Sequence, residues 1–157
     1  MTLSTETLPA PVIDWAAPFD ELVEGAAFAT AQRVITASDV QAFAELTGDH
    51  HPLHTDPAWA AAGPFGEQIA HGMLIVSIAV GLVPLDPRRI LALRGIRDAT
   101  FKRPVPLGGA VSVRGRIAAV RAVAADAGLV SFQWSVVDGS ERLACRAGVD
   151  VLWSRDA

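Results

Sequence analysis

The run MLIVSIAVGLVP, from Met73 to Pro84, is the longest apolar stretch of this 157-residue chain. It is about half as long as the roughly 20 residues that a helix needs to cross a bilayer. A run of this length that is apolar on all sides is typical of a buried helix. We therefore expect residues 73–84 to form a helix that the rest of the chain surrounds on every side.

The segments after this run have the features of strands. Four of them are separated by turns containing proline, glycine or aspartate, namely 96–105, 110–123, 129–137 and 142–153. In the last one, apolar residues such as Cys145, Val149 and Trp153 alternate with polar ones such as Arg146 and Asp150. This alternation gives a strand one buried face. The simplest architecture that uses all of these elements is an α+β domain in which an antiparallel sheet clasps one helix.

The segments before the run predict an extended lead-in over residues 1–18 and a single domain over residues 19–157. Residues 28–35 favour a short strand. Ser38 and Gln41 then have the spacing of a capping box, which predicts the start of a helix.

Glycine and proline mark the ends of the helices in this region. Gly48 is expected to end the first helix. Asp56-Pro57 predicts the start of a second, short helix, because aspartate is a good N-cap and proline suits the first helical position. Gly63-Pro64 is expected to close it.

Composition excludes several classes of function. The chain has 13 Lys and Arg against 17 Asp and Glu, a net charge of −4, so we expect neither a nucleic-acid partner nor a membrane partner. The single cysteine, Cys145, excludes an internal disulfide framework and a multi-cysteine zinc site. The first residues have no basic segment followed by an unbroken apolar one, so we expect a cytoplasmic protein without a secretory signal.

All four histidines lie between residues 50 and 71, three of them in the stretch TGDHHPLHTD from Thr47 to Asp56. In a continuous helix Asp49 and His54 would be about 140° apart around the axis. Because Gly48 ends the helix and Pro52 blocks its resumption, the chain turns and can bring this carboxylate and imidazole together. Such a pair can activate water near neutral pH. The alternative is an Asx turn at Asp49 and a surface histidine at position 54.

His71-Gly72 directly precedes the apolar run. The backbone N–H groups from Gly72 onward would lie in the first turn of the helix, where unpaired donors and the positive dipole end favour an anion. This geometry could hold a developing oxyanion, and a glycine would leave room for a substrate carbonyl. The alternative is that Gly72 only allows a tight entry into the helix.

The same histidines offer a third possibility, a metal site. His50 and His54 have the i, i+4 spacing of two ligands on one helical face. Asp49, His51 and His71 are nearby, and imidazole with carboxylate suits zinc or iron. Pro52 lies between His50 and His54 and makes a regular helix there unfavourable. We therefore expect no metal site and no cofactor.

The stretch FAELTGDHHPLHTD (43–56), together with Ala62, Phe65-Gly66 and IAHGML (69–74), resembles the MaoC-like dehydratase family, which includes the (R)-specific enoyl-CoA hydratases. The resemblance implies a hot-dog fold, usually paired into dimers, so the expected assembly is a homodimer or a larger homo-oligomer. It also implies that Asp49 and His54 are the catalytic pair and that the Gly72 amide contributes to an oxyanion hole. The implied reaction is reversible hydration of trans-2-enoyl thioesters, or dehydration of (R)-3-hydroxyacyl thioesters.

One position departs from the family pattern. The hydratases usually have Asn in an Asp-x-Asn-Pro-x-His motif where this chain has His51. A neutral histidine can donate one hydrogen bond and accept another, so it can replace much of what the amide does, and it adds a titratable group beside His54. His50 is expected to be incidental.

The substrate contacts follow from the same resemblance. We expect the acyl chain to lie along the central helix and the segment 59–65, and the substrate-binding residues are His51, His71, Trp59, Phe65 and Met73. The phosphates of CoA or of an acyl-carrier-protein arm need basic partners, for which Arg88, Arg89, Arg94, Arg97, Lys102 and Arg103 are candidates. Two other functions stay open: a hot-dog acyl thioesterase, and a non-catalytic acyl-binding subunit of a heterodimeric dehydratase.

Overall fold

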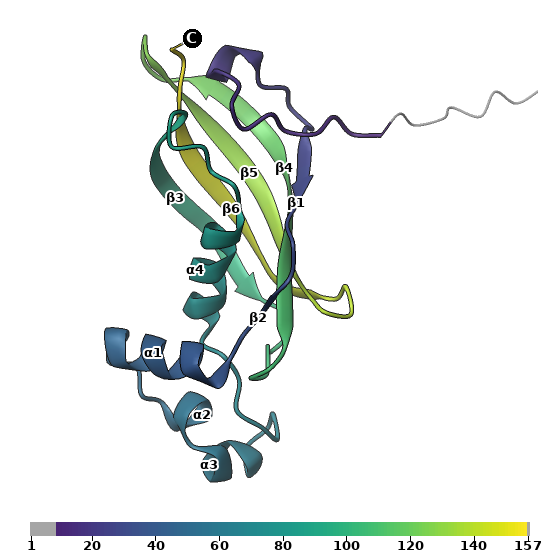
Figure 1. The fold of residues 1–157 in the computed structure, drawn as a ribbon, viewed down its shortest axis with the longest axis vertical. Coiled ribbons are helices and arrows are strands. Elements are labelled where there is room, and N and C mark those ends of the chain that lie inside the picture. Colours follow the sequence, from purple (N-terminus) through teal and green to yellow (C-terminus); the bar gives the residue numbers. More distant parts are fainter. Residues whose placement is uncertain (1–8, 157) are drawn as a thin grey trace, which may run out of the picture.

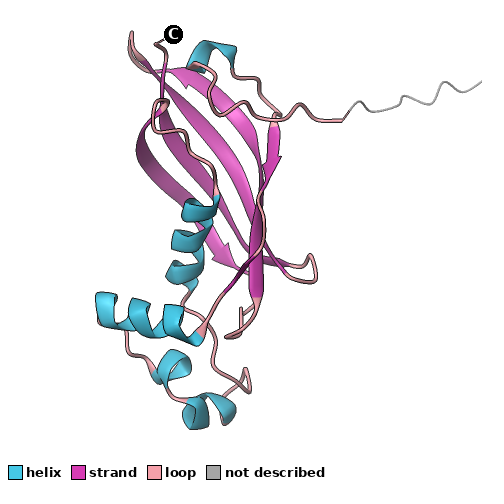
Figure 2. Ribbon diagram, viewed as in Figure 1, coloured by secondary structure: helices cyan, strands magenta, loops and turns pink. Residues whose placement is uncertain are grey.

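Six strands form one antiparallel sheet that curves around a central helix (Figures 1 and 2). The computed structural model describes residues 9–156. The strand order is β1-β4-β5-β6-β3, and β2 also pairs with β4. The strands are β1 (Ala27–Ala29), β2 (Arg33–Val34), β3 (Ile90–Phe101), β4 (Ala110–Ala122), β5 (Ala127–Asp138) and β6 (Leu143–Ser154).

The three strands predicted at the C-terminal end of the chain are confirmed. The prediction of a strand over 96–105 was wrong at both ends, because β3 begins at Ile90, opposite Trp153 of β6, and ends at Phe101. After Phe101 the Lys102 amide donates to the carbonyl of Ala144, and Pro104 has no N–H with which to continue the ladder. The strand expected over 28–35 is two shorter strands, β1 and β2, both paired with β4.

The central helix α4 (Gly72–Leu82) packs one face against the sheet. Leu74, Ile75 and Ile78 are buried on this face and join a core that includes Phe132 and Trp153. Burial of such side chains is worth about 1.5–3 kcal/mol each and provides most of the packing energy of this helix. The predicted helix clasped by an antiparallel sheet is therefore confirmed.

The expectation that this helix is surrounded on every side was wrong. The Met73 side chain is 56% exposed, and Ser77 and Gly81 are also exposed. These residues are spaced four apart and therefore share one stripe of the helix. One curved sheet covers one side of α4, which leaves this stripe uncovered in a single chain. Among residues 9–156, no helix combines the length and the apolar character that crossing a membrane would require.

The segment that precedes the sheet contributes to the core. The Trp15 ring stacks on the rings of Phe132 and Trp153 at 5.9 Å in each case. The indole N–H of Trp153 donates to the carbonyl of Ala17 at 2.9 Å. The next turn is the short 3-10 helix η1 (Phe19–Glu21). Residues 1–8 of the predicted lead-in lie outside the described residues.

Three helices gather at the N-terminal end of α4 (Figure 1). They are α1 (Ala37–Thr47), α2 (Pro52–Thr55) and α3 (Pro57–Ala61). Gly48 ends α1 in the left-handed conformation with φ of 78°, as predicted. Asp56 caps α3, as predicted, and accepts the Trp59 N–H at 3.0 Å. Pro52, which was expected to block a helix, instead occupies the first position of a new one, where its missing N–H has no cost.

The capping box of α1 lies two residues before the predicted one. The Thr36 hydroxyl accepts the Asp39 N–H at 3.1 Å, and the Asp39 carboxylate accepts the Thr36 N–H at 2.9 Å. Asp39 also pairs with Arg33 at 2.8 Å, which favours this cap over Ser38 and Gln41. These contacts hold the pKa of the Asp39 carboxyl below its usual value, the backbone hydrogen bond from Thr36 being the main cause.

Replacing Thr36 with alanine is expected to lower the free energy of unfolding by about 1 kcal/mol, because the Asp39 amide loses its acceptor. The matched control is Ser38→Ala, which removes a hydroxyl from the exposed surface of the same helix turn. Urea unfolding followed by circular dichroism measures both changes. A larger loss for Ser38→Ala than for Thr36→Ala would contradict this assignment of the cap.

Candidate active site

A cavity of about 420 Å³ opens at the N-terminal end of α4. Its walls come from segments that are far apart in sequence: the α1 and α2 region, the start of α4, the chain after β3 and the start of β6. The lining residues are Phe43, Asp49, His54, Phe65, Ile69, Ala70, His71, Gly72, Met73, Ile75, Phe101, Lys102, Arg103, Pro104, Val105, Ala144 and Cys145. Most of the wall is therefore apolar, with a few polar and charged groups.

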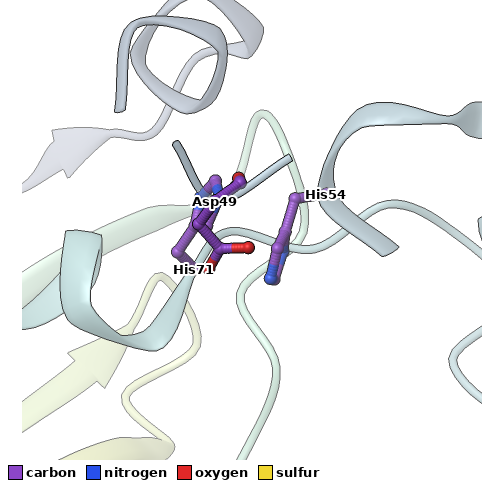
Figure 3. A group of neighbouring side chains, drawn as sticks. All are labelled: Asp49, His54 and His71. Carbon is purple, nitrogen blue, oxygen red and sulfur yellow. The ribbon is translucent and has the colours of Figure 1, made fainter. Parts of the chain in front are cut away.

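Asp49, His54 and His71 form a cluster in this cavity (Figure 3). One side-chain oxygen or nitrogen atom of each lies within 4.8 Å of the others. Asp49 follows α1, His54 lies in α2 and His71 is the residue before α4. The Asp49 carboxylate points toward the His54 ring (Figure 3). The turn predicted from Gly48 and Pro52 thus brings the carboxylate and the imidazole together.

The surroundings of His54 select one form of its ring. Its Nδ1 lies 2.7 Å from the carbonyl oxygen of Ile69. A carbonyl oxygen only accepts, so Nδ1 carries a proton, and the neutral ring leaves Nε2 as the basic nitrogen. Burial lowers the pKa of His54, the hydrogen bond to Ile69 and the charge of Asp49 opposing this in part. His54 is therefore suited to accept a proton at Nε2.

His71 supports both of its neighbours. Its side chain is 2% exposed, and its Nε2 donates to the backbone carbonyl of Asp49 at 3.0 Å. Its ring stacks on the ring of His54 with centroids 3.9 Å apart, and Phe43 packs nearby at 4.9 Å. The Nδ1 of His71 is buried and has no hydrogen-bond partner among the described residues. His71 thus fixes the position of the Asp49 backbone and one face of the His54 ring.

Gly72 is the first residue of α4, where backbone N–H groups have no partner within the helix. A Cβ at this position would lie 2.6 Å from the nearest carbon of the Phe101 ring. Such a contact is far shorter than van der Waals packing allows. The Phe101 ring thus fills the space beside Gly72, and any larger residue at this position would make that ring move.

The structure separates the predicted substrate-binding residues into two groups. His71, Phe65 and Met73 line the cavity. His51 and Trp59 are not among its lining residues and pack on each other instead, with ring centroids 5.4 Å apart. His51 also caps α2, since its Nδ1 accepts the Leu53 N–H at 3.1 Å.

Several lining residues were missed in the sequence. Phe43 lies on α1, Phe101 ends β3, and Ala144 and Cys145 begin β6. Phe43 begins the stretch 43–56 but was not named as a site residue, whereas sheet pairing brings Phe101 to the cavity, opposite Cys145 in the β3–β6 register. Burial raises the pKa of the Cys145 thiol, so this group stays protonated at neutral pH.

The six basic residues that were candidates for phosphate contacts differ in their hydrogen-bond and ion-pair partners. Arg88 pairs with Asp86 at 2.7 Å and Arg97 with Asp150 at 2.8 Å. Arg89 donates to the backbone carbonyls of Ala16 and Asp156. Of the six candidates for phosphate contacts, only Lys102 and Arg103 line the cavity.

The fold does not bring His50 and His54 together as a pair of metal ligands. Within the described residues, the cluster with suitable ligand types contains His54 together with Asp49 and His71, and not His50. In this cluster one nitrogen of His54 and one of His71 already bond to backbone carbonyls. Each ring therefore keeps a single nitrogen for other partners.

A family model described as the MaoC like domain matches residues 21–133. The chain belongs to the MaoC-like family. The match includes every residue of the cluster in Figure 3. The fold and the motif around Asp49 and His54 thus lead to the same family.

Two curated relatives of this MaoC-like chain illustrate the range of the family. The 3-hydroxyacyl-thioester dehydratase Z of Mycobacterium tuberculosis is 35% identical over 126 residues, which cover 72% of this chain and 78% of that protein. Protein MaoC of Klebsiella aerogenes is 37% identical over 97 residues, which cover 61% of this chain but only 29% of the longer protein.

Solved structures give the same picture of the MaoC-like fold. The monoamine oxidase regulatory protein of Archaeoglobus fulgidus has a TM-score of 0.85 and 30% identity, covering 90% of this chain and 96% of that one. The (R)-hydratase of Aeromonas caviae has a TM-score of 0.69 and 30% identity, covering 83% and 96%. A double hot-dog protein of Mycobacterium tuberculosis has a TM-score of 0.80 at 21% identity, covering 90% and 45%. The predicted hot-dog fold is confirmed.

Proposed function

We propose that this chain catalyses the reversible hydration of trans-2-enoyl thioesters, which in reverse is the dehydration of (R)-3-hydroxyacyl thioesters. The observation that carries the proposal is the pairing of a carboxylate and a basic imidazole nitrogen, Asp49 and His54, in the wall of a largely apolar cavity. Relatives that are named as a 3-hydroxyacyl-thioester dehydratase and an (R)-hydratase support it.

The chemistry uses one water molecule in the hydration direction. The Asp49 carboxylate orients the water, and His54 Nε2 accepts its proton while the water oxygen forms a bond to the β-carbon. The π electrons of the double bond move toward the thioester, and the Gly72 amide stabilises the negative charge on its oxygen. His54 then returns the proton to the α-carbon. Because both groups act from one wall, hydrogen and hydroxyl add to the same face.

The cavity wall suggests how the substrate lies. The apolar side chains of Phe43, Phe65 and Ile75 suit the acyl chain. Lys102 and Arg103 line the same cavity, and we assign to them the phosphates of CoA or of a carrier-protein arm.

We also propose that the working form is a homodimer or a larger homo-oligomer. Strand β3 is at the edge of the sheet and carries large apolar side chains that are exposed, with Leu91 55% and Leu93 48% exposed. Met73 on the uncovered stripe of α4 is exposed as well. An edge strand and an apolar stripe of this kind are features of surfaces that associate.

The deciding experiment follows the loss of the conjugated enoyl-thioester absorbance with crotonyl-CoA and longer trans-2-enoyl-CoAs. We expect turnover with at least one chain length and an (R)-3-hydroxyacyl product, identified by chiral chromatography. Release of free thiol from saturated acyl-CoA without hydration would indicate the thioesterase instead. Binding without any turnover would indicate a non-catalytic acyl-binding subunit.

The pH dependence of hydration follows from His54. Hydration needs this ring unprotonated, and burial lowers its pKa from 6.5. The acid limb of kcat/KM is therefore expected below pH ~6.5, the usual histidine range. His54 also binds its second proton more weakly in the folded state than in the unfolded chain. The free energy of unfolding should therefore decrease as the pH falls through the pKa that His54 has in the unfolded chain. This decrease should be smaller in His54→Ala. A kcat/KM limb above that range would contradict the assignment of His54 as the base.

A further inference from the structure

We infer that His51 is a positioning residue whose side chain caps α2 only while its ring is neutral, so that acid releases the segment that carries His54. The inference deepens the proposed function and rests on it for its catalytic meaning. It concerns the position where the hydratases usually have Asn, and it starts from three hydrogen bonds that His51 makes.

His51 connects the two catalytic candidates. Its backbone N–H donates to the Asp49 carboxylate at 3.3 Å, and its backbone carbonyl accepts the His54 N–H at 2.9 Å. Its side-chain Nδ1 accepts the Leu53 N–H at 3.1 Å, which caps the first turn of α2. His51 is therefore bonded to both residues of the pair and helps to set the position of His54 relative to Asp49.

The side-chain bond requires one protonation state. The Leu53 N–H can only donate, so Nδ1 must be the unprotonated nitrogen and Nε2 carries the proton. In this form Nδ1 accepts a backbone N–H at the start of the helix, as the side-chain oxygen of an N-cap Asn does. A protonated imidazole has N–H groups at both positions, and its Nδ1–H would face the Leu53 N–H, so the bond cannot form. An Asn at this position would keep its acceptor at every pH.

The surroundings of the His51 ring leave it free to gain this proton. The ring is exposed to solvent, and it packs edge-on against Trp59 of α3, which is not titratable. The charged or titratable groups around it are Asp49 and His50 before it, His54 in α2 with a ring centroid 6.1 Å away, Asp56 at the cap of α3, and His71 behind His54. Solvent can therefore exchange protons with this ring.

Two effects of this proton oppose each other, and their sizes decide the outcome. Loss of a cap changes the equilibrium constant between the ordered and the released segment by about fivefold. The positive charge on His51 also disfavours protonation of His54, but across 6.1 Å of solvent it is worth about twofold at physiological salt. The lost cap therefore dominates, and added salt weakens only the opposing effect.

The test compares His51→Asn with wild type, using trans-2-enoyl-CoA hydration between pH 8 and pH 5.5. We expect equal kcat/KM at pH 8 and an advantage for His51→Asn of about two- to threefold at pH 5.5, rising toward about fivefold at high salt. His51→Ala, which has no cap at any pH, should be slower already at pH 8, by up to about fivefold. His50→Asn, which removes the neighbouring exposed imidazole, is the matched control and should follow wild type.

A second measurement does not depend on turnover. In the ¹⁵N-labelled wild-type protein, the Leu53 amide resonance should move with the same midpoint as the His51 ring protons, and in His51→Asn it should not titrate. The inference would be overturned if the Leu53 amide resonance did not move while the His51 ring titrates. It would also be overturned if kcat/KM fell with decreasing pH in the same way in wild type and in His51→Asn. Failure of every enoyl thioester to react would contradict the proposed function, while the Leu53 titration still decides whether the cap is pH-dependent.

Discussion

Replacing Asp49 with Asn or His54 with Ala is expected to lower kcat/KM for enoyl-thioester hydration by about 10²- to 10⁴-fold in each case. Asp49→Asn keeps the shape of the side chain but removes the charge that faces His54 (Figure 3). His54→Ala removes the basic nitrogen and also the hydrogen bond to the Ile69 carbonyl. Stopped-flow or steady-state loss of the enoyl absorbance measures both.

The double variant sharpens this expectation. Because the two groups act on the same water, the Asp49→Asn/His54→Ala protein should lose little more than the slower single variant. His50→Ala, in the same loop but outside the cavity lining, is the control and should keep wild-type kcat/KM. Full activity in either single variant, with the thermal melting temperature unchanged, would show that the catalytic pair lies elsewhere.

Gly72→Ala is expected to impair both folding and catalysis. The new Cβ would lie 2.6 Å from the Phe101 ring, and overpacking of this kind typically costs about 1–3 kcal/mol in the free energy of unfolding. The backbone amide at the start of α4 would shift with it. Displacing one oxyanion donor lowers kcat by about 10²- to 10³-fold.

A second variant separates packing from catalysis. Phe101 is 49% exposed, so Gly72→Ala/Phe101→Ala should relieve the clash at a moderate cost. We expect Gly72→Ala to lower the free energy of unfolding much less in the Phe101→Ala background than in the wild-type protein. Denaturant unfolding and kcat are measured on all three proteins. A Gly72→Ala protein as stable as wild type would contradict the packing of Phe101 on Gly72.

The local parts of this structure could be predicted because each depends on neighbouring residues. Gly48 has a positive φ and ends α1, and Asp56 caps α3. The same applies to the turn that joins Asp49 to His54, since Gly48 and Pro52 restrict the backbone on both sides of it.

The parts that could not be predicted depend on contacts across the chain. The cap of α1 is Thr36 and not Ser38, because Asp39 bonds back to the Thr36 backbone and pairs with Arg33 on β2. The role of Phe101 in the cavity depends on its register opposite Cys145, which no short stretch of sequence contains. The support that His71 gives to His54 likewise requires the packing of α4 beside α2.

Alkylation of Cys145 can be used to measure access to the cavity. It is the only thiol in the sequence, it is 1% exposed and it lines the cavity. Its raised pKa further slows alkylation, which proceeds through the thiolate. The rate at which an alkylating reagent modifies the native protein therefore measures how readily the reagent reaches the part of the cavity wall that β6 contributes. A bound acyl chain that fills the cavity should suppress that rate, so a single mass shift per chain can report occupancy without any added label.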